Sequence, residues 1–90
     1  MALTWPTKDP DAVLDYQIDW SAWLDGDTIA SSAWLIGGSL VEDSSSYTDT
    51  ATTIWLSGGD DDTSYTIVNR ITTAAGRTDD RSVTLPCAER

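Results

Sequence analysis

Apolar and polar side chains alternate along two long segments of this chain, and the alternation restricts its fold more than any other feature. The apolar positions are Leu14, Tyr16, Ile18 and Trp20 in the first segment and Tyr65, Ile67 and Ile71 in the second. A period of two residues is typical of a β-strand with one buried face. No stretch of ten residues keeps a helical period, so the pattern predicts an all-β chain.

Turn signals divide the rest of the sequence into short extended runs. Residues 22–24 end the first strand, and further runs cover 28–36, 40–42, 50–56 and 81–85, with a serine-rich loop at 43–49 and loops at 57–63 and 74–77. In the run 28–36, apolar residues occur at both odd and even positions. This indicates either a bulge in the strand or a strand that is covered on both faces. We therefore expect an immunoglobulin-like or fibronectin III-like antiparallel sandwich of about six or seven strands.

Ninety residues make one domain. Pro6 and Pro10 interrupt strand pairing, so residues 1–11 are expected to form an extended N-terminal arm. The sandwich itself is expected to span residues 12–86, followed by a C-terminal tail at 87–90.

The charge balance narrows the choice of partners. Fifteen acidic residues against five basic ones give a net charge of −10, which disfavours nucleic acid and anionic membranes and favours a basic protein surface. No signal peptide and no apolar stretch of about 20 residues is visible. Cys87, the single cysteine, has no partner for an internal disulfide, which is consistent with folding in a reducing cytosol.

The residue inventory argues against catalysis. The chain contains no histidine, so the commonest general base and metal ligand is missing and a Ser–His–Asp or Cys–His arrangement is impossible within one chain. No glycine-rich phosphate loop precedes a helix, and Cys87 is interpreted as an incidental thiol. We expect neither an enzyme nor a cofactor.

Two acidic turns are weak candidates for a cation site. Asp25 and Asp27 lie in one turn and Asp60 and Asp62 in another, and the two turns are expected to meet at one end of the sandwich. Aspartate-rich loops supply the oxygen ligands that Ca²⁺ prefers, although neither stretch has the spacing of an EF-hand. Because Asp is common in turns, where its side chain forms local hydrogen bonds, we expect these residues to be solvated turn residues that bind no metal ion.

The tryptophans divide between core and surface. Trp20 and Trp55 are expected in the core, whereas Trp5 and Pro6 in the arm, and Trp23 where the first strand ends, are expected at a partner interface. Alternatively, the arm folds back and Trp5 caps the open end of the sandwich.

Two polar residues are expected to have structural roles. Asn69 shares the inward parity of its strand and needs buried hydrogen-bond partners. Tyr65, at the start of that strand, is expected to bond back to the preceding loop as a tyrosine corner does.

Four ordered segments carry a resemblance to a known family. They are Asp19–Leu24 (DWSAWL), Gly26–Ile29 (GDTI), Ile54–Gly59 (IWLSGG) and Asn69–Arg77 (NRITTAAGR). Together they resemble small structural proteins of tailed bacteriophages that are described as fibre-tail adaptors or small virion proteins. The resemblance covers roughly residues 8–85, and the acidic stretch 60–62 departs from the glycine-containing turn of the family pattern.

The resemblance implies an immunoglobulin-like virion component, made in the host cytoplasm, that joins tail, neck, fibre or capsid subunits in several copies by protein–protein contact. It implies no catalytic residues. Capsid decoration is an alternative role within the virion, and a module that binds Ca²⁺ or carbohydrate is the alternative from another class.

Overall fold

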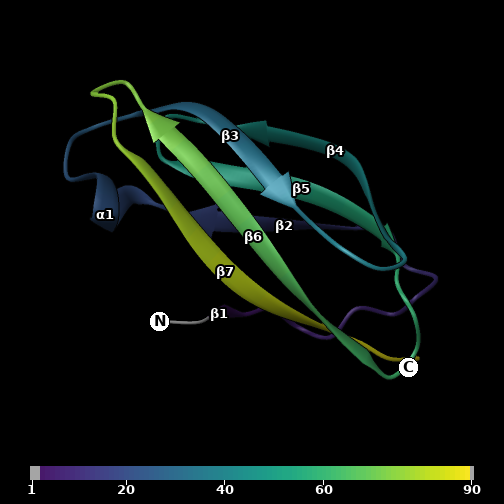
Figure 1. The fold of residues 1–90 in the computed structure, drawn as a ribbon. Helices are drawn as coiled ribbons and strands as arrows, with labels where there is room; N and C mark the ends of the chain where they lie inside the picture. The colour runs from purple at the N-terminus through teal and green to yellow at the C-terminus, as the bar shows by residue number, and fades with distance from the viewer. Residues whose placement is uncertain (1–2, 90) are drawn as a thin grey trace.

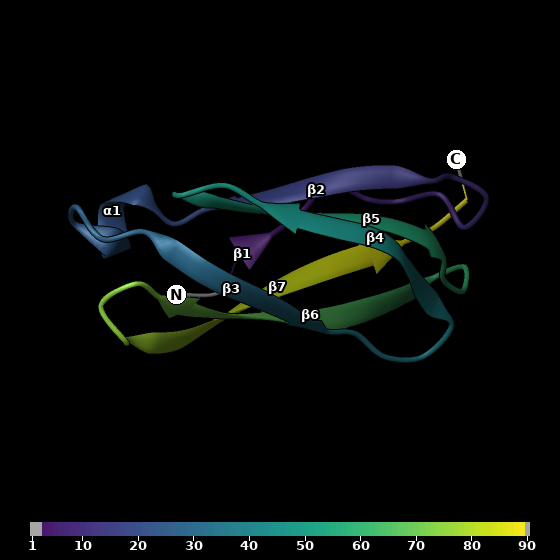
Figure 2. The same cartoon turned by 90° about the horizontal axis from the view of Figure 1, so that it is seen from above.

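Two β-sheets packed face to face make up the protein in the computed structural model, which describes residues 3–89 (Figures 1 and 2). The elements are β1 (Leu3–Thr4), β2 (Leu14–Asp19), α1 (Ser21–Leu24), β3 (Ile29–Leu35), β4 (Leu40–Tyr47), β5 (Ala51–Gly58), β6 (Thr63–Thr73) and β7 (Thr78–Cys87). One sheet has the order β1-β7-β6-β3 and the other β2-β5-β4. The predicted all-β sandwich of about six or seven strands is confirmed.

The strand pairing is antiparallel with one exception. β1 runs parallel to β7, with Leu3 opposite Val83, whereas the other neighbours pair antiparallel. The chain then leaves β7 and crosses to the other layer, where β2 pairs with β5. The N-terminal segment therefore links the two sheets.

The core consists of two groups of buried side chains that follow the predicted alternation. The first group is Tyr16, Leu40, Ile54, Leu56, Tyr65, Ile67, Leu85 and Cys87, and the second is Ile18, Trp20, Leu24, Ile29, Ile71 and Val83. Asn69 lies on β6 between Ile67 and Ile71, at the junction of the two groups. The interior is thus apolar on both sides of one buried amide.

The end of the first strand differs from the expectation. Residues 22–24 do not extend β2, because Ser21–Leu24 form the single helical turn α1. A carboxylate oxygen of Asp19 accepts a hydrogen bond from the Ser21 amide at 2.9 Å, and Asp25 ends the turn with a left-handed φ of 48°. Residues four apart share one side of a helical turn, so Leu24 is buried together with Trp20.

The serine-rich segment is the largest error in the predicted strands. A loop was expected at 43–49, but β4 continues through Tyr47 with a bulge between Glu42 and Ser44. Every residue of β4 after Leu40 is exposed, so this edge strand has no apolar alternation by which to recognise it. The loop expected at 57–63 is shorter and covers residues 59–62, because β5 extends to Gly58 and β6 begins at Thr63.

A bulge explains the two parities of the third extended run. The register of β3 against β6 shifts between Ile29 and Ser31. One extra residue moves the following side chains to the other face. Ile29 is therefore buried before the bulge and Trp34 packs inward after it.

The N-terminal segment is extended and lies along β7. The Trp5 amide donates to the Thr84 carbonyl at 2.9 Å, and the Lys8 amide donates to the Pro86 carbonyl at the same distance. Cys87 is the last residue of β7 and is buried. Met1, Ala2 and Arg90 lie outside the described residues, and the predicted domain boundaries stay a prediction.

Candidate partner interface

Trp5, the first predicted interface residue, bridges the two sheets. Its backbone is bonded to β7, while its ring stacks on Tyr16 of β2 with centroids 4.6 Å apart and planes 18° apart. The ring of Trp34 on β3 also lies near it, with centroids 6.1 Å apart. The half-buried ring packs against both core groups, so most of its contacts are inside the domain. Pro6, its neighbour, is exposed.

Lys8 is a buried cation that the sequence did not single out. Its side chain is fully buried, and its Nζ donates to the carbonyls of Gly58 at 2.6 Å and Asp9 at 3.0 Å. A buried ammonium is stable only when its donors are paired. Lys8 therefore fastens the N-terminal segment to the end of β5, a role that only the three-dimensional arrangement reveals.

Trp23, the other predicted interface tryptophan, lies half-buried on α1. Its ring meets Trp20 edge-on at 5.5 Å, and the guanidinium of Arg77 lies 4.5 Å above its centroid. Arg77 also donates to the Leu24 carbonyl at 2.8 Å. These contacts hold α1 against the β6–β7 turn. That Trp5, Pro6 or Trp23 contacts a partner stays a prediction.

Asp27 completes the attachment of α1. Its carboxylate pairs with Arg77 at 3.2 Å and accepts from the Thr28 amide at 2.8 Å. A hydrogen bond from the Thr73 hydroxyl is the main cause that lowers the pKa of Asp27, with smaller contributions from Thr28, Arg77 and Ala75. This carboxylate serves the structure of the turn.

The two acidic turns do not meet, so the expectation that they converge is wrong. Asp27 contacts the turn after β6, whereas the Asp60 amide donates to Tyr65 near the start of β6. Eleven residues of β6 separate these ends, and Figure 2 places α1 and the β5–β6 loop at opposite ends of the sandwich. Within residues 3–89, no group of three His, Cys, Asp or Glu side chains is arranged to hold a metal ion.

The tyrosine corner predicted at Tyr65 is confirmed. Its phenolic oxygen accepts the Asp60 amide at 2.8 Å and lies 3.0 Å from the hydroxyl of Ser39. It therefore joins the β5–β6 loop to the loop before β4. The hydroxyl of Tyr47 likewise joins the edge strands of the two sheets by donating to the Ala30 carbonyl at 2.7 Å.

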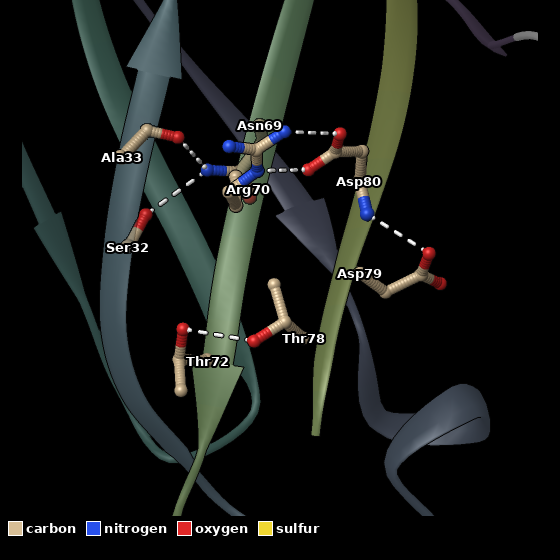
Figure 3. Close-up of polar contacts among 8 residues, drawn as sticks. All are labelled: Ser32, Ala33, Asn69, Arg70, Thr72, Thr78, Asp79 and Asp80. Carbon is tan, nitrogen blue, oxygen red and sulfur yellow. Dashed lines mark hydrogen bonds and ion pairs between the residues drawn. The ribbon is translucent and has the colours of Figure 1, made fainter. Parts of the chain in front are cut away.

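The outer face of the β6–β7 hairpin carries paired charges. Arg70 forms a double hydrogen bond with Asp80, at 2.7 and 3.0 Å, across the two strands (Figure 3). Thr72 and Thr78 make a second cross-strand contact. The Arg70–Asp80 ion pair leaves that part of the surface electrically balanced.

Trp55 is exposed, so its predicted place in the core is wrong. On β5, Thr52, Ile54 and Leu56 face the interior and are buried, which directs Trp55 to the outside, where 43% of its surface is accessible. The alternation along the strand predicts this exposure, because Trp55 stands between Ile54 and Leu56 and therefore points to the opposite face. Its position in the middle of a strand was the misleading signal.

Comparisons with known proteins agree with this geometry. Residues 8–86 match the family described as podophage GP4 fiber-tail adaptor protein gp77. The chain belongs to this fibre-tail adaptor family. The match begins at Lys8 and ends beside Cys87, so it spans the strands from β2 to β7 and leaves out β1.

A solved structure supports the fold of this fibre-tail adaptor. The solution structure of the PKD domain from KIAA 1837 protein is 17% identical, with a TM-score of 0.50 over 99% of this chain and 79% of that one. At this identity the likeness concerns the fold alone. No curated protein matches the sequence. In residues 3–89 no helix is long and apolar enough to cross a membrane.

Proposed function

We propose that this protein is a virion subunit that joins tail or fibre components of a podophage by protein–protein contact, without catalysing a reaction. The observation that carries the proposal is the family match over residues 8–86. The name of that family describes an adaptor between fibre and tail. The proposed location is the virion, and the partners are other virion proteins.

The architecture suits such a role. Both core groups are sealed by the two sheets, and the polar atoms of Asn69 are all used inside. What the molecule offers to a partner is its outer sheet faces and its edge strands β1, β2, β3 and β4, each of which pairs on one side only. Edge strands and exposed aromatics are the usual contact surfaces of small β-modules.

The charge supports protein partners in several copies. A net charge of −10 repels phosphate backbones and favours basic protein surfaces. Repeated copies on a symmetric ring add avidity to individually weak contacts. We therefore propose multiple copies per particle and no direct contact with nucleic acid or membrane.

Removing the gene from the phage that encodes this chain tests the proposal. Particles made without the protein should have filled heads and lack fibres, and a plasmid copy should restore the fibres. Quantitative mass spectrometry of wild-type particles should give a copy number that matches the tail subunits. A copy number that matches the capsid subunits, with fibres still attached in the deletion, would support capsid decoration and contradict the adaptor role.

A further inference from the structure

The outer face of the β2-β5-β4 sheet combines an exposed tryptophan with unpaired acidic residues. Trp55 stands at the centre of this face, opposite Asp15 on β2 and Ser44 on β4. Val41, which is 51% exposed, pairs with Ser57 on the same side. Asp43 reaches this side too, because its carboxylate accepts from the Ser57 hydroxyl at 3.0 Å. We call Asp15, Val41, Asp43 and Trp55 the Trp55 face.

Charge distinguishes this face from the rest of the described surface. The three strands β2, β4 and β5 contain four acidic residues and no lysine or arginine. Within residues 3–89, the two ion pairs involve Asp80 and Asp27, so neither Asp15 nor Asp43 has a cationic partner. The Trp55 face therefore has a local negative charge that nothing on its own sheet offsets.

The cations of the described chain are already engaged elsewhere. Lys8 is buried against backbone carbonyls, and Arg70 is paired with Asp80. Arg77 and Arg81 lie over the rings of Trp23 and Trp20, at 4.5 and 4.1 Å. The ring of Trp55 has no such cation above it among the described residues. Among the described residues, no cation is left to lie over this ring.

We propose that the Trp55 face binds a basic surface of another virion subunit, with a lysine or arginine over the Trp55 ring and a second cation beside Asp15 and Asp43. An indole attracts a cation lying within about 6 Å of its centroid, and tryptophan is enriched among residues that dominate binding energy. The carboxylates add electrostatic steering and fix the orientation of the partner. This inference rests on the proposed function.

A second copy of the chain is a poor occupant for the same reason. Two Trp55 faces brought together would oppose their carboxylates, in molecules that each carry a net charge of −10. Like charges across an interface suppress association. The acidic face therefore selects a partner of opposite charge.

A pair of matched variants compares the contribution of the Trp55 face to assembly with that of the outer face of the other sheet. Trp55→Thr removes the indole from the outside of β5, and Leu35→Thr makes the same kind of change on β3, where Leu35 is 60% exposed. Threonine suits a strand in both places. Thermal unfolding by circular dichroism first establishes that both variants fold.

Particle incorporation is then measured by quantitative immunoblotting of purified virions. We expect W55T to weaken binding to the particle by about 30-fold, the equilibrium effect of losing one dominant contact, so that the amount of protein per particle falls well below wild type. We expect L35T to leave that amount within about twofold. Equal incorporation of folded W55T and wild type would overturn the inference. Absence of the wild-type protein from particles would instead contradict the proposed function.

A photo-crosslinking amino acid at position 41, which lies on the same face and leaves Trp55 in place, identifies the occupant. In assembled particles it should cross-link to a lysine- or arginine-rich segment of a different virion protein, and the same group at position 35 should not. Cross-linking to a second copy of this chain, or to an acidic segment, would overturn the proposal. The double variant D15N/D43N should release the protein from particles at a lower salt concentration than wild type, and an unchanged salt concentration would count against the charge pairing.

Discussion

The indole nitrogen of Trp20 donates a hydrogen bond to the side-chain oxygen of Asn69 across 3.0 Å in the buried centre of the sandwich. The same oxygen accepts the Thr52 hydroxyl at 2.7 Å. On its other side the amide nitrogen of Asn69 donates to the Ser32 hydroxyl and the Ala33 carbonyl, both at 3.0 Å (Figure 3). One side chain thus ties β6 to its neighbour β3 and to the opposite sheet.

Asn69→Ala should therefore be strongly destabilising. The change leaves the Trp20 and Thr52 donors buried without an acceptor, and each unsatisfied group costs about 1–3 kcal/mol. We expect the free energy of unfolding to fall by about 2–4 kcal/mol, because the truncation also removes packing. Urea unfolding followed by tryptophan fluorescence measures this change.

Thr66→Ala provides the control for the same strand. Thr66 is exposed on β6, so its truncation should alter stability by no more than about 0.5 kcal/mol. If Asn69→Ala cost as little as Thr66→Ala, the buried network would contribute nothing measurable to the joining of the sheets.

Strand parity accounts for the parts of the fold that the sequence could predict. Tyr16, Ile18 and Ile67 alternate with polar residues because each strand has one buried face. The same parity placed Asn69 inside, where it needed partners. The partners themselves lie 17, 37 and 49 residues away in sequence, so no local pattern could identify them.

The features that were missed depend on contacts between distant segments. β4 carries serines on an exposed edge, so it has the composition of a loop, and only its pairing with β5 makes it a strand. The burial of Lys8 depends on the Gly58 carbonyl. Trp55 is a different case, because its alternation with the buried Ile54 and Leu56 placed it on the outer face, and the prediction relied instead on its position in the middle of the strand.

Lys8→Met tests how firmly the N-terminal segment is attached. Methionine keeps most of the buried stem but removes the donors to the carbonyls of Gly58 and Asp9. A buried carbonyl that loses its partner costs about 1–3 kcal/mol, so we expect a loss of stability in that range. Lys8→Ala should cost more, because it also leaves a cavity.

Guanidinium unfolding of wild type, K8M and K8A separates the two contributions. Increased proteolysis of the first residues in K8M would show that this segment detaches locally before the sandwich unfolds. A K8M protein as stable as wild type would mean that the buried ammonium does not hold the segment in place.

Gly58→Ala and Gly76→Ala form a matched pair of glycine substitutions. Both glycines have positive φ, 73° and 90°, so alanine is strained at either position by about 1 kcal/mol. A Cβ at Gly58 would lie 2.6 Å from the Ser39 carbonyl oxygen, whereas one at Gly76 would have nothing within 4 Å. We expect the free energy of unfolding to fall by about 1 kcal/mol in G76A and by clearly more in G58A, as measured by thermal unfolding. Equal losses would show that the Ser39 backbone moves aside at no cost.

The pH dependence of stability should depend on Asp27. Its pKa is lowered from the ordinary value of 3.8, chiefly by the Thr73 hydroxyl. A carboxyl whose pKa is lower in the folded state than in the unfolded one stabilises the fold above its unfolded pKa, and that contribution is lost as the pH falls through the folded value. Asp27→Asn should therefore lower stability at pH 7 and flatten its decline below about pH 5.

Asp25→Asn is the control for that experiment, because it removes a carboxylate from the same exposed turn without breaking the Arg77 pair. Both variants remove one negative charge at pH 7 from a chain with a net charge of −10, so the relief of self-repulsion is the same in both and cancels when they are compared. Urea unfolding of wild type, D27N and D25N between pH 7 and about pH 2.5 should show the smaller acid loss in D27N alone. If D25N flattened the acid decline as much as D27N, the effect would come from overall charge, and the hydrogen bonds that hold α1 to the β6–β7 turn would not explain it.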